Sequence, residues 1–154
     1  MPGYKTWATN DVITASDMNE LHADPLTQDV ATNESRTSST YGDLSTVGPA
    51  VTKSLVAGQK VLVYISAFIV SASDGKTGRM SFAVSGASTL SAIDANAARY
   101  FNVKVGTNAG DLVGQWTLYT ATNTGSHTFT AKYKSDDGVT SFDFLDRRII
   151  IKPF

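Results

Sequence analysis

Short alternations of apolar and polar residues fill the last two thirds of the chain. The clearest is HTFTAKYK (127–134), in which Phe129, Ala131 and Tyr133 alternate with polar residues. RMSFAVS (79–85) has the same period of two. Because successive side chains of a strand point to opposite faces, this period predicts strands that are buried on one face.

Two further stretches extend this pattern. QKVLVYISAFIVS (59–71) carries apolar residues on both faces, which is typical of a central strand. ARYFNVKV (98–105) is expected to turn Phe101, Val103 and Val105 inward. The other candidate strands are 51–56, 88–93, 112–120, 139–144 and 147–152.

Turn-forming sequences separate these strands. SDGKTG (73–78), TNAGD (107–111), NTGS (123–126) and SDDG (135–138) are rich in Gly, Asn, Asp and Ser. Short strands at this spacing predict an all-β domain over 47–154, built as an antiparallel β-sandwich. A jelly roll or a related Greek key is the expected topology.

A short helix is predicted near the N-terminus. Thr14 is a good N-cap, Asp17 lies in the first helical turn, and the proline at Asp24-Pro25 ends the helix near residue 23. Two turns of helix are too short to be stable alone in water. The helix must therefore rest on another chain or on the body of this one. The residues expected to make that attachment are Trp7, Val12, Ile13, Met18, Leu21 and Pro25.

The segment between helix and sandwich, TQDVATNESRTSSTYGDLST (27–46), is rich in Ser and Thr. Its composition is that of a flexible linker. The alternative, which we adopt, is an extended arm that lies along a partner surface and forms backbone hydrogen bonds there. The chain then has three parts: an anchoring segment (1–26), an arm (27–46) and a β-sandwich (47–154).

Charge and composition exclude several classes of function. The formal net charge is -1, from 13 basic and 14 acidic residues, so we expect no nucleic-acid partner. The chain has no cysteine, hence no disulfide and no thiolate metal site. No apolar run approaches the ~18 residues of a membrane span, and MPGYKTW lacks the features of a signal peptide. We therefore expect neither membrane insertion nor signal-directed secretion.

Candidate catalytic groups are sparse. His22 and His127 belong to different parts of the chain, and His127 is expected at the surface or the rim of the sandwich. Asp136 and Asp137 precede a glycine and form a turn, without the further oxygen ligands of a calcium loop. No hydrolase motif surrounds the serines. We expect a non-enzymatic protein with no metal and no cofactor.

Two parts of the sequence resemble a known group of proteins. WATNDVITASDMNELHADPL (7–26) resembles the opening of many virion proteins of tailed bacteriophages. GSHTFTAKY (125–133) and DRRIIIKPF (146–154) are similar to the last strands of small jelly rolls, of the trimeric tumour-necrosis-factor-like kind, in the same phages. His22 and Asp24 depart from this pattern, so an interface charge pair of the relatives is not expected here.

The resemblance implies a bacteriophage virion structural protein, made in the host cytoplasm and located on the capsid or tail surface. It implies a homotrimer that is attached through its N-terminal segment to the major capsid protein or to tail proteins. Capsid decoration is favoured over a short tail fibre or minor tail protein.

A receptor-binding, lectin-like module that binds a host surface glycan is the rival interpretation. We expect Trp116 in the core, and Tyr100 and Tyr119 at the inner surface of a trimer. Arg147 and Arg148 are expected at a solvated strand edge or in an inter-subunit ion pair. The candidates for a trimer interface or a glycan contact are Tyr100, Trp116, Tyr119, Arg147 and Arg148.

Overall fold

The computed structural model describes residue 12 and the ranges 24–103 and 108–153. The predicted N-terminal helix lies outside the described residues. So do four of the expected attachment residues, namely Trp7, Ile13, Met18 and Leu21.

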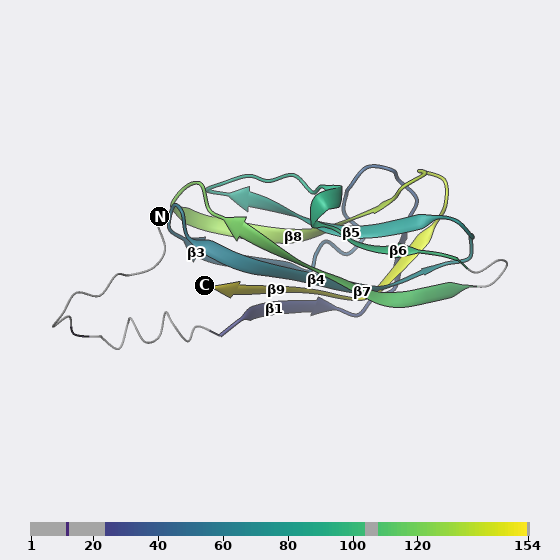
Figure 1. Cartoon of the computed structure of the whole chain (residues 1–154), viewed down its shortest axis with the longest axis horizontal. Coiled ribbons are helices and arrows are strands. Elements are labelled where there is room, and N and C mark those ends of the chain that lie inside the picture. Colours follow the sequence, from purple (N-terminus) through teal and green to yellow (C-terminus); the bar gives the residue numbers. More distant parts are fainter. Residues whose placement is uncertain (1–11, 13–23, 104–107, 154) are drawn as a thin grey trace.

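The described residues form two antiparallel sheets and one short 3-10 helix (Figure 1). One sheet has the strand order β1-β9-β4-β7, with β2 also paired to β9, and the other has the order β3-β8-β5-β6. The all-β prediction is confirmed. The elements are β1 (Leu26–Val30), β2 (Glu34–Arg36), β3 (Ala50–Leu55), β4 (Lys60–Ser71), β5 (Thr77–Gly86), η1 (Asp94–Asn96), β6 (Ala98–Phe101), β7 (Ala109–Thr120), β8 (Gly125–Ser135) and β9 (Phe142–Pro153).

The strand pairing is nested. β5 pairs with β6, β4 with β7, β3 with β8, and β1 with β9, all antiparallel. Such pairing is that of one long hairpin whose two arms run side by side. Pairing of β4 with β9 and of β5 with β8 then closes the arms into two sheets.

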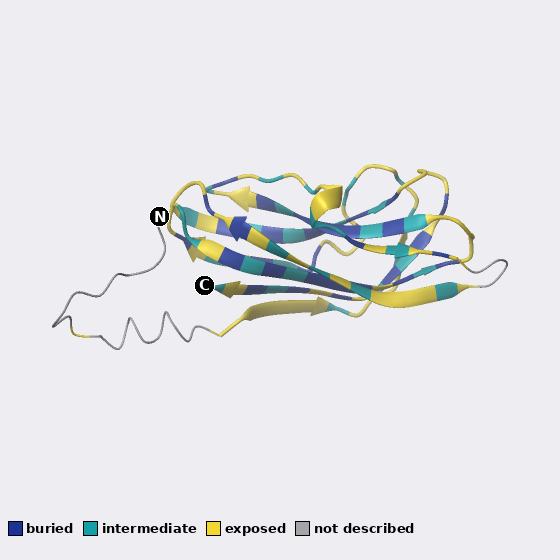
Figure 2. Cartoon of the chain, viewed as in Figure 1, coloured by how far each residue is buried: buried dark blue, intermediate teal, exposed yellow. Residues whose placement is uncertain are grey.

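The core lies between the inner faces of the two sheets (Figure 2). The alternation predicted for β5 and β8 is confirmed, because their apolar residues are buried and face the other sheet. Burying each large apolar side chain contributes about 1.5–3 kcal/mol. The buried apolar residues from β4, β5 and β8 are Val61, Val63, Ile65, Ala67, Ile69, Met80, Phe82, Val84, Phe129, Ala131 and Tyr133.

β6 presents the opposite face from the predicted one. Phe101 is 52% exposed and Val103 is 71% exposed, whereas Asn102 is fully buried. The Asn102 side chain donates a hydrogen bond to the Ser71 carbonyl (2.9 Å), and its backbone N–H donates to the Lys76 carbonyl (2.9 Å). These two bonds hold Asn102 inside, so its apolar neighbours turn outward.

The first half of the predicted arm is part of the sandwich. β1 pairs with β9 from Leu26 opposite Ile151 onward, and β2 pairs with β9 from Glu34 opposite Phe144. The structure places this segment on its own chain instead of on a partner: 27–30 and 34–36 pair with β9 on one side. In its second half, Gly42 bridges Tyr133 and Leu44 is buried in the core.

The C-terminal strand is continuous where two strands were predicted. β9 passes through Asp146, whose φ is 47°, and its register with β4 shifts between Ser66 and Phe68. An extra residue of this kind is a β-bulge, which bends a strand without ending it. The predicted strand 88–93 is absent; a single bridge joins Leu90 to Val84.

Candidate interaction surface

The outer face of the β1-β9-β4-β7 sheet is apolar along β4 and β7. Leu112, Trp116 and Leu118 are 62%, 51% and 52% exposed. Beside them on β4, Leu62 lies opposite Leu118, and Phe68 lies opposite Leu112. Most exposed large apolar residues of a domain are scattered, so a row of this kind marks a contact surface. We call the outward residues of β4 and β7 the apolar face.

Trp116 was expected in the core and lies on this apolar face instead. Its ring packs on that of Tyr64, with centroids 4.6 Å apart and planes at 36°. Tyr119, on the alternate face of β7, is buried and meets the Phe129 ring edge-on at 5.1 Å. Both faces of LVGQWTLYT carry large residues, so alternation alone did not decide which face is inward.

A pocket of about 450 Å³ lies beside Trp116. Asp29 and Arg148 line it and form an ion pair with 2.6 Å between Nε and Oδ1. The hydrogen bond and the charge of Arg148 hold the pKa of the Asp29 carboxyl below its usual value. The remaining lining residues are Pro25, Thr27, Ile150 and Lys152.

Arg147 is fully buried, which corrects the expectation of a solvated strand edge or an inter-subunit pair. Its Nη2 lies 3.1 Å from Glu34 Oε2 and donates to the Thr32 carbonyl at 3.2 Å. Its guanidinium lies over the Tyr133 ring, 5.5 Å from the centroid. Burial opposes ionisation of Glu34, yet hydrogen bonds from Thr46 and the charge of Arg147 lower the pKa of that carboxyl. This pair fastens the β2 segment to the core.

The other expected contact residues are distributed unevenly. Arg148 and Pro25 are exposed, Tyr100 is half-buried, and Val12 is 80% exposed. Tyr119 is buried in the chain's own core, so it does not reach a surface where a trimer neighbour or a glycan would contact it.

The outer face of the other sheet is charged and internally paired. Arg79 donates two hydrogen bonds of 2.7 Å to the Asp136 carboxylate. Lys134 Nζ lies 2.8 Å from Asp94 Oδ1, which also accepts a hydrogen bond of 3.0 Å from the Tyr41 hydroxyl. Burial opposes ionisation of Asp136, but Arg79 and Lys134 lower the pKa of its carboxyl. These charges neutralise one another within the chain.

His127 was expected at the surface and is fully buried. Its Nδ1 lies 2.9 Å from the Gly125 carbonyl, which can only accept, so Nδ1 carries the proton. Its Nε2 then accepts from the Ser88 hydroxyl at 2.9 Å, and Ser88 in turn accepts from Thr122 and the Asn123 N–H. Both ring nitrogens are therefore occupied by hydrogen bonds within the chain, and neither is free to exchange a proton with a substrate.

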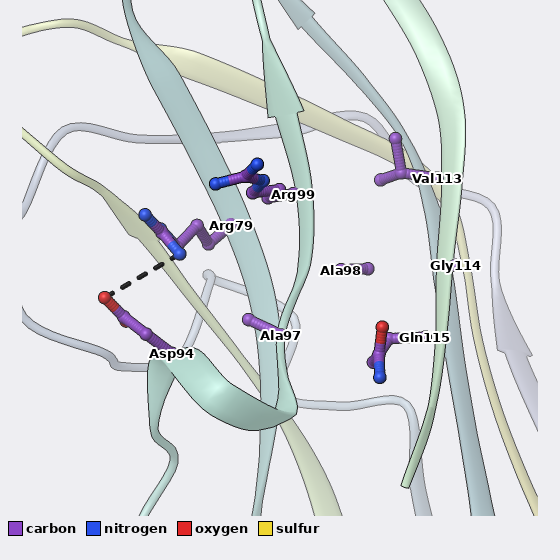
Figure 3. A pocket seen from close by; sticks show the side chains of 8 residues that line it. All are labelled: Arg79, Asp94, Ala97, Ala98, Arg99, Val113, Gly114 and Gln115. Carbon is purple, nitrogen blue, oxygen red and sulfur yellow. Dashed lines mark ion pairs between the residues drawn. The ribbon is translucent and has the colours of Figure 1, made fainter.

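The free edges of β6 and β7 face each other across a pocket of about 460 Å³ (Figure 3). Arg79, Asp94 and Arg99 line the β6 side. Gly114 and Gln115 line the β7 side. No backbone hydrogen bond joins the two strands within the described ranges, so β7 keeps an unpaired edge.

No protein-family model matches the chain, and no curated protein matches it. Solved structures that match include infectious bursal disease virus, Gt strain (11% identity, TM-score 0.46, 85% of this chain and 34% of that chain). The VP2 subviral particle of the same virus matches with 10% identity, a TM-score of 0.46, and 85% and 33% coverage. Dimeric latent PorU from Porphyromonas gingivalis matches with 12% identity, a TM-score of 0.40, and 82% and 13% coverage. This chain spans about a third of the length of these two viral chains.

Within the described part of the chain, no helix is long and apolar enough to cross a membrane. No group of three or more His, Asp or Glu residues gathers there in a way that would hold a metal ion.

Proposed function

We propose that this chain is a non-enzymatic structural protein of a tailed-bacteriophage virion, and that it forms a homotrimer on the capsid surface. The observation that carries the proposal is the apolar face of β4 and β7. Leu112, Trp116 and Leu118 are exposed in the isolated chain, and contiguous apolar patches of this kind are contact sites for other protein surfaces.

The topology supports the same proposal. Nested pairing of β1 with β9, β3 with β8, β4 with β7, and β5 with β6 is that of a jelly roll, in which a long hairpin is rolled into two sheets. We therefore infer a jelly-roll sandwich. The similarity of 125–133 and 146–154 to trimeric phage jelly rolls agrees with this topology.

The chemistry of the described residues supports a role without catalysis. Asp94 and Asp136 are ion-paired, and both ring nitrogens of His127 are occupied by hydrogen bonds within the chain. A general acid or base needs a group that is free to exchange a proton with a substrate. The charged groups described here are instead engaged in holding the fold.

Attachment is proposed to use residues 1–26, with the major capsid protein or tail proteins as partner. The sequence 7–26 supports this, because the short helix predicted from it would need a surface to rest on. Co-sedimentation with phage particles tests it. The full chain should bind, while a chain lacking 1–26 and the variant Leu21→Asp should remain in solution with the sandwich folded. Equal binding of the truncated chain would refute the anchoring role.

Copy number separates the two virion sites. Hundreds of copies on each particle would place the protein on the capsid, and a few copies would place it at the tail as a short fibre or minor tail protein. Quantitative mass spectrometry of purified particles measures this number directly.

A lectin-like role is the second candidate, favoured by the pocket beside Trp116. An exposed indole next to the Asp29–Arg148 pair offers a stacking surface and hydrogen-bonding groups to a sugar ring. Glycan-array binding that is lost in Trp116→Ala, but kept in Leu112→Ala, would support this role over a purely structural one.

A further inference from the structure

The four sheet edges differ in how they are protected. β1 has five residues and begins after Pro25, β3 has six residues and follows Pro49, and β6 has four residues and includes Arg99. β7 has twelve residues, without lysine or proline, and Asp111 is its only charged residue. Short strands, charges and prolines keep sheet edges from pairing with other chains. β7 is the longest of these four edge strands, and Asp111 near one end is its only protection of this kind.

The backbone groups on the free edge of β7 can be identified. The Leu112 N–H donates to the Asp111 carboxylate at 2.8 Å, and the Trp116 carbonyl accepts from Gln115 Nε2 at 2.8 Å. These groups therefore point away from β4. Residues of an antiparallel strand alternate in this respect, so Gly114 and Leu118 also point to the free edge. Even-numbered residues of β7 thus present a row of donors and acceptors at the free edge, of which the Leu112 N–H and the Trp116 carbonyl are bonded to side chains of their own strand.

We propose that β7 pairs antiparallel with β7 of a second copy of this chain, about a two-fold axis at Gln115. Leu112 then lies opposite Leu118 of the second copy, and Gly114 lies opposite Trp116 of the second copy. Each of these pairs exchanges backbone hydrogen bonds, for which the Asp111 and Gln115 side chains release the Leu112 N–H and the Trp116 carbonyl. The two sheets join into one continuous sheet, and the two apolar faces join on the same side.

The identity of the partner follows from the self-complementarity of the strand. In this register the bulky indole of each copy stands beside a glycine that has no side chain to obstruct it. The two Asp111 carboxylates lie far apart, because Asp111 is opposite Tyr119 of the second copy, which puts roughly 27 Å of strand between them. An isologous contact of this kind requires one surface only, and two-fold dimers are the commonest assemblies.

The contact goes beyond the proposed function and does not depend on a virion. A two-fold contact joins copies in pairs. By itself it gives a dimer, and together with the proposed trimer contact it gives a hexamer. The native mass of the full chain, at a set of concentrations, should therefore correspond to an even number of copies.

A proline on the free edge tests the hydrogen bonds separately from the apolar face. Leu118→Pro removes a free-edge N–H without touching the ladder to β4, whereas Leu118→Thr removes the apolar side chain and keeps the N–H. We expect Leu118→Pro to halve the native mass and Leu118→Thr to keep even-numbered assembly, both with a folded sandwich by circular dichroism. A monomer or a trimer in the unchanged chain, or a mass that Leu118→Pro leaves unaltered, would overturn the edge contact.

A single introduced cysteine tests the register, because the chain contains none of its own. Gln115→Cys places the two cysteines opposite each other in a non-hydrogen-bonded pair, where the Cα separation of about 4.5 Å suits a disulfide. Thr117→Cys is the matched control on the same face, with its two copies about 13 Å apart. Under mild oxidation the first should form a covalent dimer and the second should not. The reverse result, or no dimer in either, would overturn the register.

The two proposals fail in distinguishable ways. Particle binding is assigned to residues 1–26, and the edge contact to β7. A β7 variant that loses even-numbered assembly but still binds particles contradicts neither proposal, and supports the edge contact. Loss of particle binding on deletion of 1–26 says nothing against β7 pairing, which the mass measurement decides by itself.

Discussion

The outer faces of the two sheets are built from the same alternation and differ in character. On the β3-β8-β5-β6 sheet, the outward residues include Lys132 and Lys134, and each is neutralised by an aspartate of the same chain. On the β1-β9-β4-β7 sheet, β4 and β7 expose Leu112, Trp116 and Leu118 with no covering element among the described residues. The charged face has its ion partners within the isolated chain. The apolar face is exposed to solvent, and covering it with another surface would be stabilising.

The largest expected effect comes from a comparison of the buried side and the exposed side of one strand, β9. Arg147 faces the core and is paired with Glu34, while Arg148 faces solvent and is paired with Asp29. Arg147→Ala removes the fully buried cation of this ion pair and leaves the partly buried Glu34 carboxylate without its counter-charge, so the free energy of unfolding should fall by about 3–5 kcal/mol. Arg148→Ala should change it far less, because that ion pair is exposed to solvent. Urea unfolding measures both, and equal effects would contradict the assigned faces.

The next effect compares the two outer faces directly. Trp116→Lys puts a charge on the apolar face, and we expect self-association to weaken by about 2 kcal/mol, roughly 30-fold, if this residue is a centre of the contact. Thr130→Lys is the matched change on the charged face and should leave the association constant unaltered. Sedimentation equilibrium measures both constants. Equal weakening by the two variants would show that net charge, and not the apolar face, controls assembly.

A smaller effect is expected within the charged face. Arg79→Ala removes three hydrogen bonds to Asp136, but the pair is partly exposed. The loss of unfolding free energy should be about 0.5–1 kcal/mol, and it should shrink as salt is added. Thermal unfolding at low and high ionic strength measures this, and an effect independent of salt would show that packing of the side chain dominates.

The smallest effect concerns pH. Asp137 accepts hydrogen bonds from the Thr140 and Val139 N–H groups, which lower the pKa of its carboxyl well below 3.8. A group whose pKa is depressed in the folded state contributes stability above its unfolded pKa and loses it as the pH falls through the folded value. Stability should therefore decline below about pH 4, and Asp137→Asn should flatten that decline. Unfolding midpoints between pH 6 and pH 2 test this, and an unchanged slope would assign the acid sensitivity to other carboxylates.

Much of the fold was predictable because its information is local. The period of two in 79–85 and 127–134 predicted both the strands and their buried faces. The Asp and Gly turns marked where strands end. The sequence also indicated the central place of 59–71, which pairs with β7 on one side and β9 on the other.

The candidate site was predicted only in part. Trp116 was selected from the sequence and assigned to the wrong face, while Leu112 and Leu118 were grouped with it correctly as residues of one face. His127 and Arg147 were placed at the surface because isolated polar residues usually lie there. Their burial depends on partners far along the chain, such as Ser88 and Glu34, that no local pattern identifies.

The sequence alone determined where strands and turns form and that the sheets are antiparallel. The reason is that the period of apolar residues and the chemistry of turns are set within a few neighbouring residues. The tertiary structure decided which face of β7 is inward, where the polar residues Asn102 and Arg147 lie, and that residues 26–36 join the sandwich. For β7 the physical reason is that large residues stand on both of its faces, so its pattern fits either orientation. Long-range pairing makes the choice, because it buries one face and leaves the other exposed.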